Sequence, residues 1–355
     1  MPKKVGLILI NYKDYAAQYL EACRDSLQLQ TYPVGMMTVF IVDNSSSEAS
    51  RRYLETVYPQ ARVLPRPDGN YTAASNLGMR AAIADGCEYL VTVNMDTEMH
   101  PEWLAELVAA METNPDAGIA QSKILLYPQN EAERAQPRIN SLGNIIHFLG
   151  FGFTDGYDQA DREIIGYPEI PGYASGCSFI VRPAVVEKIG GYNEEFYMYH
   201  DDLEFSLKAK LAGYKIILAP RSVIFHKYEF KRSTKMIYYM ERNRYLTMLS
   251  FYPGKLLFLI SLPALFMDIG MFFLSIFSGW FRSEMRIYGY FFHPSTYAKI
   301  KKERESLKQL RIVSFSRIAR HFSGRITFQK VDNPVLRYIV NPLLDIYWQL
   351  IKKLI

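Results

Sequence analysis

Two acidic sequences, far apart in the chain, contain the residue types that a group-transfer enzyme needs. Asp201 and Asp202 are adjacent, at the predicted beginning of a helix. Neighbouring negative charges raise the pKa of a carboxyl group and can prepare it as a general base. Asn94-Met95-Asp96 follows the very apolar run Tyr89–Val93, and the ends of such strands present ligand-binding groups. One carboxylate that holds a metal ion and another that accepts a proton fit metal-assisted transfer from a nucleotide, so the sequence predicts an enzyme.

The elements that must position these residues alternate between strand and helix. The order predicts an α/β fold, with a mostly parallel sheet that is covered by helices on both faces. Ligands of such sheets bind beyond the carboxyl ends of the strands, where Asn11, Asp43 and Asp96 fall. The predicted strands are Val5–Ile10, Thr38–Val42, Ala61–Leu64 and Tyr89–Val93, and the predicted helices are Tyr15–Gln30, Ser50–Val57, Ala73–Asp85 and Pro101–Thr113.

Polar residues at these strand ends suggest a nucleotide site. Asp43 can accept hydrogen bonds from a base or a ribose, and a role in a helix cap or turn is equally open. Asn70 and Asn76 belong to a small-residue loop that runs into a helix, whose N-terminus favours anions, although Gly-Asn also marks ordinary turns. Asp96 would coordinate Mg²⁺ or Mn²⁺ through oxygen while a diphosphate completes the shell; its alternative is a helix cap.

The stretch from Asn140 to Tyr173 is rich in glycine and aromatic residues. Aromatic faces stack on sugar rings, which suggests an acceptor site, but such turns also occur as ordinary loop packing. Cys177 precedes the apolar run Phe179–Val181, and no histidine lies near it in sequence. We expect Cys177 to be a small packing residue rather than a nucleophile.

Length and cysteine content limit the class of protein. A chain of 355 residues exceeds the usual size of one hydrophobic core, so a second segment is expected. Three separated cysteines without metal-ligand spacing argue against a disulfide framework. Met1–Ile10 has two lysines and only a short apolar run, which favours a buried first strand over a signal peptide.

Charge and hydropathy set the C-terminal region apart. The net charge of +5 combines +10 in residues 282–355 with −5 in residues 1–281. The run Leu256–Phe281 contains one charge, Asp268, and is long enough to span a bilayer; a buried core helix is the alternative. Pro263 and the Asp268–Gly270 pair offer a bend, so we expect a re-entrant or interfacial hairpin rather than a single span. Basic residues occur on both sides of the run: Lys231, Arg232, Lys235, Arg242, Arg244, Lys255, Arg282 and Arg286.

The last residues, Pro342–Ile355, are predicted to form an amphipathic helix with Leu344, Tyr347, Trp348 and Ile351 on one face. This face would contact either the membrane or the catalytic domain. The predicted division of the chain is a catalytic domain over residues 1–235, a helical connection with the apolar segment over 236–281, and a basic region over 282–355.

Seven short motifs follow one another along the chain: Ile10–Tyr12, Val42–Ser46, Gly69-Asn70 through Gly78, Asn94–Asp96, Ser175–Cys177, Asp201-Asp202 and Glu241–Arg244. Taken in order, they resemble family 2 glycosyltransferases with the GT-A fold, in the branch of bacterial rhamnosyltransferase-like enzymes. The resemblance covers about residues 5–250.

The resemblance implies inverting sugar transfer from a nucleoside-diphosphate sugar with a divalent metal, Mg²⁺ or Mn²⁺. Asp202 would be the base, and Asp96 would hold the metal and diphosphate, with His226 nearby. Asn94 stands where stricter members have Asp, which removes one carboxylate from the metal motif. The resemblance further implies nucleotide contacts by Asn11, Asp43, Asn70, Asn76 and Asn94, and acceptor or supporting roles for Asp201, Ser175, Gly176, Arg242 and Asn243.

These expectations define an enzyme at the cytoplasmic face of a cell membrane that contacts membrane lipid and extends a lipid-linked glycan, without nucleic acid as a partner. The sequence names neither the sugar nor an oligomeric state.

Two alternative classes of protein stay open. A sugar nucleotidyltransferase would normally have a Gly-rich basic phosphate loop, which Asn11–Asp14 does not resemble. A non-catalytic glycan-binding or assembly subunit would not need Asp96 and Asp202 together.

Overall fold

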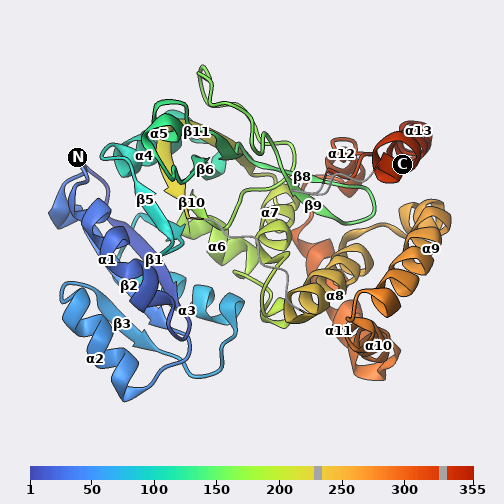
Figure 1. The fold of residues 1–355 in the computed structure, drawn as a ribbon, viewed down its shortest axis with the longest axis horizontal. Helices are drawn as coiled ribbons and strands as arrows, with labels where there is room; N and C mark the ends of the chain where they lie inside the picture. The colour runs from blue at the N-terminus through green and yellow to red at the C-terminus, as the bar shows by residue number, and fades with distance from the viewer. Residues whose placement is uncertain (228–233, 328–333) are drawn as a thin grey trace. The chain divides into compact units, whose positions relative to one another are not determined.

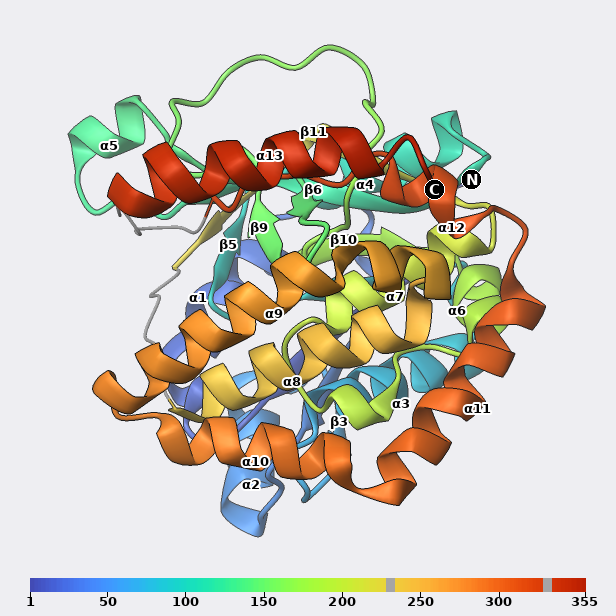
Figure 2. The ribbon, with the colours of Figure 1, turned by 90° about the vertical axis from the view of Figure 1, so that its right-hand side faces the viewer.

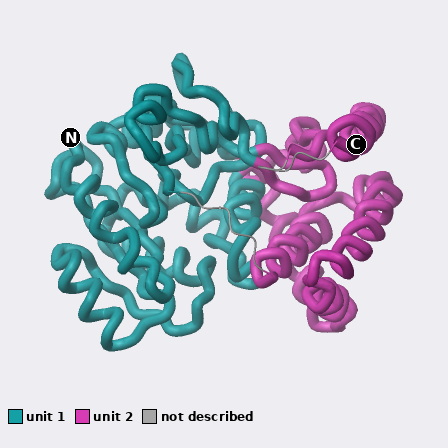
Figure 3. The backbone as a smooth tube through the Cα atoms, in the orientation of Figure 1, with its two compact units in different colours: residues 1–144, 154–209, 214–229 teal, residues 145–153, 210–213, 230–355 magenta. Residues whose placement is uncertain are grey.

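The computed structural model describes residues 1–227, 234–327 and 334–355. The chain forms two compact units (Figure 3). The first contains residues 1–144, 154–209 and 214–229, and the second contains residues 145–153, 210–213 and 230–355. Lys231 and Arg232, two of the basic residues before the apolar run, lie outside the described residues. The division of the chain at residues 235 and 281 stays a prediction.

The first unit is built on a mixed β-sheet (Figure 1). Within the described residues the strand order is β3-β2-β1-β4-β10-β6-β11-β5, and β7 pairs with β6. The strands are β1 (Val5–Asn11), β2 (Met37–Asp43), β3 (Arg62–Pro65), β4 (Tyr89–Val93), β5 (Thr97–Met99), β6 (Ala117–Leu126), β7 (Ile139–Ser141), β10 (Ser178–Val181) and β11 (Lys215–His226). The helices are α1 (Tyr15–Gln28), α2 (Glu48–Val57), α3 (Tyr71–Ala84), α4 (Trp103–Thr113), α5 (Glu131–Ala135), α6 (Pro183–Ile189) and the greater part of α7 (Asp201–Leu211), with 3₁₀ turns at Val34–Met36 and Glu194–Phe196.

The N-terminal half of the sheet agrees with the predicted alternation of strand and helix. β1 pairs in parallel with β2 and β4, and β2 pairs in parallel with β3. All seven residues of β1 are buried, as expected for a strand that is covered on both faces. α2 begins two residues before its predicted start because the Ser47 hydroxyl accepts a hydrogen bond from the Ser50 N–H at 3.0 Å and caps the helix.

The other half of the sheet is mixed, so the expectation of a mostly parallel sheet is only partly correct there: β6 and β11 pair in parallel. β10 is antiparallel to both β4 and β6, and β5 is antiparallel to β11. A short apolar run has the same pattern in either direction, so the sequence of β10 did not reveal its orientation. This orientation matters for the site, because Ser178 pairs with Val93 and the residues before β10 therefore lie beside the carboxyl end of β4.

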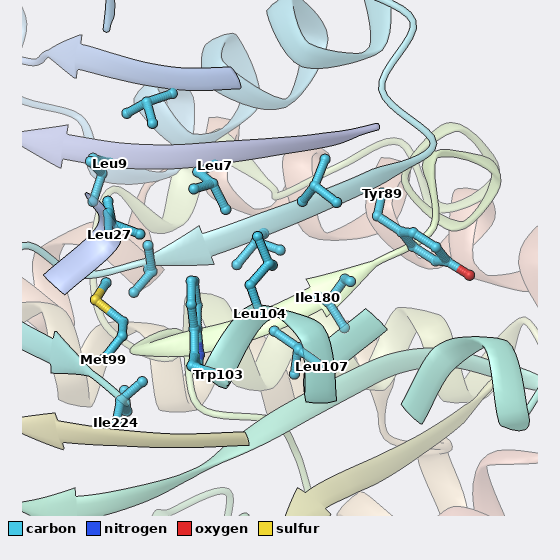
Figure 4. Packing of buried hydrophobic residues seen from close by; sticks show 14 of the residues in the cluster. Leu7, Leu9, Leu27, Tyr89, Met99, Trp103, Leu104, Leu107, Ile180 and Ile224 are labelled. Carbon is cyan, nitrogen blue, oxygen red and sulfur yellow. The ribbon is translucent and has the colours of Figure 1, made fainter. Parts of the chain in front are cut away.

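A continuous apolar core supports the sheet (Figure 4). Leu7 of β1 and Ile180 of β10 belong to one cluster with Leu104 and Leu107 of α4. Trp103 is fully buried there, and its indole N–H donates to the Ser122 hydroxyl at 2.9 Å. The polar end of the ring is thus paired, and α4 is held against the strands that end at the site.

The second unit is mainly helical. Its described elements include the hairpin of β8 (Asn144–Ile146) and β9 (Gly152–Thr154), whose outermost residues belong to the first unit. Its helices are α8 (Thr234–Phe251), α9 (Gly254–Phe277), α10 (Phe281–Phe292), α11 (Pro294–Leu310), α12 (Phe315–Ala319) and α13 (Asn341–Ile351), which continues from a π-type turn at Leu336–Val340.

The apolar run forms one helix as far as Phe277, so the bend predicted at Pro263 or Asp268–Gly270 is wrong. α9 continues through Pro263 and through Asp268–Gly270, and the chain turns only after Phe277. A proline removes one hydrogen bond, and here the helix continues beyond it. Within the described residues, α9 is the one helix that is long and apolar enough to cross a membrane, by length and composition.

The predicted face of the last helix is packed against protein. Trp348 is fully buried, stacks on Phe148 with ring centroids 5.1 Å apart, and donates its indole N–H to the Phe322 carbonyl at 2.7 Å. The face is therefore packed against protein, but the partner surface belongs to the second unit and not to the catalytic domain that the alternative named. Phe148 and Phe151 are buried, so the packing alternative also holds for these two rings of the predicted acceptor stretch.

Candidate active site

Asn11 and Asp43 meet at the carboxyl ends of β1 and β2. The two residues are partners in the strand register, and the Asn11 amide donates to Asp43 Oδ1 at 2.9 Å. The Ser50 hydroxyl donates to Asp43 Oδ2 at 2.5 Å, so both carboxylate oxygens are already held. Asn44 follows directly, and its buried Oδ1 has no hydrogen-bond partner in the described residues. This strand end therefore offers a fixed carboxylate and an unused amide acceptor to a ligand.

The predicted small-residue loop is fastened to the segment that precedes α7. Asn70 caps α3 by accepting the Ala73 N–H at 3.1 Å, and its amide donates to the Glu194 carbonyl at 3.0 Å. The backbone N–H groups of Tyr71 and Thr72 donate to the Tyr197 carbonyl at 2.9 and 3.3 Å. The first-turn amides that the sequence offered to an anion are therefore paired within the protein.

Asn76 joins the same two segments. Its amide donates to the Tyr192 carbonyl at 2.9 Å and to Glu194 Oε1 at 3.1 Å, and its Oδ1 accepts the Tyr192 N–H at 2.8 Å. Both amide hydrogens of Asn76 are donated within the protein, so its side chain positions the Tyr192–Glu194 segment. Nucleotide contact by Asn70 and Asn76 stays a prediction.

Asp96 and His226 are brought together by the pairing of β5 with β11. Thr97 and His226 are partners in that register, and Asp96 Oδ2 lies 3.3 Å from His226 Nε2. The other imidazole nitrogen, Nδ1, lies 2.9 Å from the Asn140 amide oxygen and can donate to it. Asp96 Oδ1 is buried and has no hydrogen-bond partner in the described residues.

This arrangement favours a positive charge beside Asp96. Burial disfavours the imidazolium, but the neighbouring Cys177 and Asp96 raise the pKa of His226 above its usual value. A proton donated from Nδ1 to Asn140 leaves Nε2 of the neutral ring directed toward Asp96, which is the tautomer that a metal ligand needs. Either a proton on His226 Nε2 or a bound metal cation would compensate the negative charge of Asp96, which faces that nitrogen.

The residues present fit a metal ion that is only partly held by protein. Asp96 supplies oxygen and His226 supplies nitrogen, while the described residues contain no group of three His, Cys, Asp or Glu side chains that could enclose an ion. Asn94, where a stricter motif has Asp, is consistent with this small number of ligands. Mg²⁺ and Mn²⁺ commonly retain water and substrate phosphate oxygens in such sites.

The loop Ser175–Cys177 connects the metal motif to the predicted base. The Cys177 carbonyl accepts the Asn94 N–H at 3.0 Å, and the Gly176 N–H donates to Asp202 Oδ2 at 3.1 Å. The Ser175 N–H donates to the Gln121 amide oxygen at 2.7 Å, which fixes the loop to β6. A backbone bridge of three residues therefore links the two acidic motifs.

Asp201 and Asp202 begin α7, as predicted. Burial raises the pKa of Asp202 to about 6, while the Gly176 and Leu203 N–H groups that donate to its carboxylate limit the rise. Burial raises the pKa of Asp201 further, because the adjacent charge of Asp202 adds to it. The side chain of Asp202 is less buried than that of Asp201. A partly exposed carboxylate with a raised pKa is suited to general base catalysis.

Three residues shortly before α7 have positive φ angles although none of them is glycine. The φ angles are 64° at Tyr197, 63° at Tyr199 and 58° at His200. Non-glycine residues rarely adopt this region, and such strain is typical of functional segments. The strained turn places the Tyr197 carbonyl at the start of α3 and the two carboxyl groups at the start of α7.

Sequence reasoning gave no role of their own to several tyrosines that surround the carboxylates, although Tyr71 and Tyr173 lie in predicted segments. Tyr173 and Tyr192 are buried and Tyr71 is half-buried, and burial together with the charges of Asp201 and Asp202 raises the pKa of each phenol. Gln121 was missed, and Asn140 was predicted only as the start of the acceptor stretch, since single polar residues within apolar strands look like ordinary sheet residues. Arg242 and Asn243 lie on α8 of the second unit, where the Arg242 guanidinium donates to Asn243 Oδ1. Their acceptor or supporting role stays a prediction.

The chain belongs to glycosyl transferase family 2, whose family model matches residues 7–188. It is 27% identical over 228 residues to O-antigen biosynthesis protein RfbC of Myxococcus xanthus, covering 62% of this chain and 17% of that protein. It is 26% identical over 225 residues to N-acetylglucosaminyl-diphospho-decaprenol L-rhamnosyltransferase of Mycobacterium tuberculosis, covering 59% of this chain and 71% of that protein. An uncharacterized protein, y4gI of Sinorhizobium fredii, is 29% identical over 204 residues, which are 54% of this chain and 21% of y4gI.

The fold is GT-A-like. The crystal structure of GalNAc-T7 with UDP, GalNAc and Mn²⁺ superimposes with a TM-score of 0.54 at 13% identity, over 71% of this chain and 49% of that chain. The chain spans only about a fifth of the first two curated relatives. The family confirms the predicted class of enzyme, a glycosyltransferase, and does not support the alternative of a sugar nucleotidyltransferase.

Proposed function

We propose that the chain is an inverting glycosyltransferase that transfers a sugar from a nucleoside-diphosphate sugar to a lipid-linked glycan at the cytoplasmic face of a membrane. The observation that supports this most is the bridge Ser175–Cys177, which hydrogen-bonds to Asn94 on one side and to Asp202 on the other. A short distance between a diphosphate site and a base is what direct displacement at an anomeric carbon requires.

Asp202 is the proposed base. Its carboxylate would take the proton of the acceptor hydroxyl as the acceptor oxygen bonds to the anomeric carbon. The bond from that carbon to the diphosphate oxygen would break, and the nucleoside diphosphate would leave with the electron pair. One displacement inverts the anomeric configuration. The Gly176 N–H keeps Asp202 in place during this step.

Asp96 and His226 are the proposed protein ligands of a divalent metal, and Asn140 orients the imidazole. When bound, Mg²⁺ or Mn²⁺ would neutralise charge on the diphosphate and stabilise the leaving group. Asn11 holds Asp43 for the nucleoside, and Asn44 presents a free acceptor beside it. Asn70 and Asn76 hold α3 to the Tyr192–Glu194 segment.

The acceptor class rests on the relatives. One of them is named as a rhamnosyltransferase that acts on N-acetylglucosaminyl-diphospho-decaprenol, and another as an O-antigen biosynthesis protein. We propose an acceptor of this type, a polyprenyl-diphosphate glycan, within the biosynthesis of a cell-envelope polysaccharide. Membrane lipid is then a natural partner of the second unit.

The test is release of nucleoside diphosphate from a panel of nucleotide sugars, with a polyprenyl-linked glycan, in Mn²⁺ or in a chelator. The proposal predicts metal-dependent release with at least one donor, and a product whose anomeric configuration, read by NMR, is inverted. A retained configuration would refute single displacement. Pyrophosphate formation from a sugar phosphate and a nucleoside triphosphate would instead identify a nucleotidyltransferase.

A further inference from the structure

The outward side of α9 is apolar over the whole length of the helix. Phe258, Phe266, Phe273 and Phe277 are 79%, 67%, 56% and 84% exposed, and exposed leucines and isoleucines lie between them. At 1.5 Å per residue, the 24 residues of α9 extend about 36 Å. Exposed apolar surface of this extent marks a site of contact with a membrane or with another protein.

The opposite side of α9 is fastened to the second unit along its length. Leu256 and Ile260 are buried near its start, and Ser275 is buried near its end. At its middle, the Tyr245 hydroxyl donates to Asp268 Oδ1, and Arg244 Nη2 lies 3.4 Å from the same oxygen. The single acidic side chain of α9 is therefore neutralised by α8.

α13 presents a second apolar stripe, distinct from the buried face of Trp348. Leu343, Ile346 and Leu350 are 63%, 61% and 61% exposed and follow helical spacing. The Tyr347 hydroxyl donates to the Leu259 carbonyl of α9 at 2.5 Å, so the two helices are neighbours within the second unit (Figure 2). We call the exposed apolar residues of α9 and α13 the apolar platform.

Exposed cations lie at the ends of both helices. Lys255 is in the first turn of α9, and Arg282 follows its last residue by a short turn. Arg337 precedes α13, and Lys353 follows it. Apolar side chains with Lys and Arg beside them match the boundary between the acyl chains and the headgroups of an anionic leaflet.

We propose that the apolar platform lies in the plane of one anionic leaflet, so that the protein is held on the membrane and α9 does not cross it. A spanning α9 would take Asp268 to the middle of the bilayer together with Arg244 and its other partner, Glu241. Charged groups on α8 would then enter hydrocarbon, which is costly. The proposal deepens the membrane location given under the proposed function and rests on it.

Flotation of the full-length protein with vesicles tests the docking surface. The platform variant is Phe258→Gln, Phe266→Gln and Leu350→Gln together, and the matched control replaces three equally exposed apolar residues elsewhere, Leu29, Val34 and Ile165, by Gln. We expect wild type and control to float with vesicles of phosphatidylcholine and phosphatidylglycerol, and the platform variant to bind at least about tenfold more weakly. Equal binding of all three proteins would overturn the proposal.

Charge substitutions test the anionic requirement. Lys255→Gln and Lys353→Gln should each weaken binding to phosphatidylglycerol vesicles by about fivefold at low salt and leave binding to pure phosphatidylcholine unchanged. If the platform variant instead converts a dimer into a monomer while wild type fails to float, the platform is an interface between copies and the proposal is wrong.

Thiol labelling distinguishes docking from spanning. All three native cysteines are buried, so Lys255→Cys and Ser278→Cys report the two ends of α9 separately. In sealed vesicles with protein added from outside, both ends should react with a membrane-impermeant maleimide. Protection of one end alone would indicate a span. Donor turnover in detergent, measured on the same variants, separates failure of this proposal from failure of the transferase proposal.

Discussion

The buried ion cluster that holds α9 to α8 gives a prediction about stability. Arg244 is fully buried, and its guanidinium lies 2.9 Å from Glu241, 3.4 Å from Asp268 and 3.1 Å from the Leu149 carbonyl. Arg244→Met removes the cation, so the carboxylates of Glu241 and Asp268 lose their counter-charge and the Leu149 carbonyl loses its hydrogen-bond donor. Breaking a buried pair from one side costs about 3–5 kcal/mol, because the remaining charge stays desolvated.

A graded series checks this reasoning. Asp268→Asn keeps a hydrogen-bond partner for Tyr245 and leaves Glu241 to neutralise Arg244, so it should cost about 1–2 kcal/mol. Arg325→Met is the matched control, because Arg325 is 64% exposed and its pair with Asp345 should contribute less than about 1 kcal/mol.

The assay is urea unfolding of the detergent-solubilised protein, followed by tryptophan fluorescence, and Trp348 lies in the same unit. The expected order of destabilisation is Arg244→Met, then Asp268→Asn, then Arg325→Met. If Arg244→Met costs no more than Arg325→Met, the cluster does not hold the second unit together and the reasoning fails.

Three predictions concern the site. Transfer should fall as pH decreases through about 6, because Asp202 must be ionised to act as a base. A pKa that is raised by folding also means that ionisation of Asp202 destabilises the folded protein as pH rises. Asp202→Asn should therefore raise the melting temperature at pH 8. A flat pH profile from 5 to 8 would remove the base assignment. Asp96→Ala should abolish measurable Mn²⁺-dependent binding of the nucleoside diphosphate by calorimetry, and unchanged affinity would place the metal elsewhere. Asn140→Leu should weaken Mn²⁺ binding by about 10–100-fold in electron paramagnetic resonance titrations, with partial recovery in Asn140→Asp; equal affinities would deny it an orienting role.

Local patterns in the sequence predicted the parallel half of the sheet and the positions of the acidic motifs. Asp202 at the start of α7 and Asp96 after β4 depend on neighbouring residues, which a sequence displays directly. The antiparallel direction of β10 depends on how distant segments connect, and its apolar residues read alike in both directions. The link from Gly176 to Asp202 follows from that direction and could not be predicted.

Long-range pairing also explains what was missed around the metal motif. Asn140 and His226 are 86 residues apart, and nothing near either residue predicts their contact. On α13, the sequence placed Trp348 on an apolar face but did not show that Phe148 covers it, so the exposed stripe with Leu343 and Ile346 became evident only in the fold.

The most direct test of the central claim is the rate of sugar transfer by Asp202→Asn at saturating donor and acceptor. Asp116→Asn is the matched control, since Asp116 lies at the surface in a pair with Lys215. The amide keeps the shape of the side chain but cannot accept the proton, so we predict a loss of about 10²–10⁴-fold in kcat with donor affinity nearly unchanged, and no loss in the control. Near-normal turnover by Asp202→Asn would contradict the account.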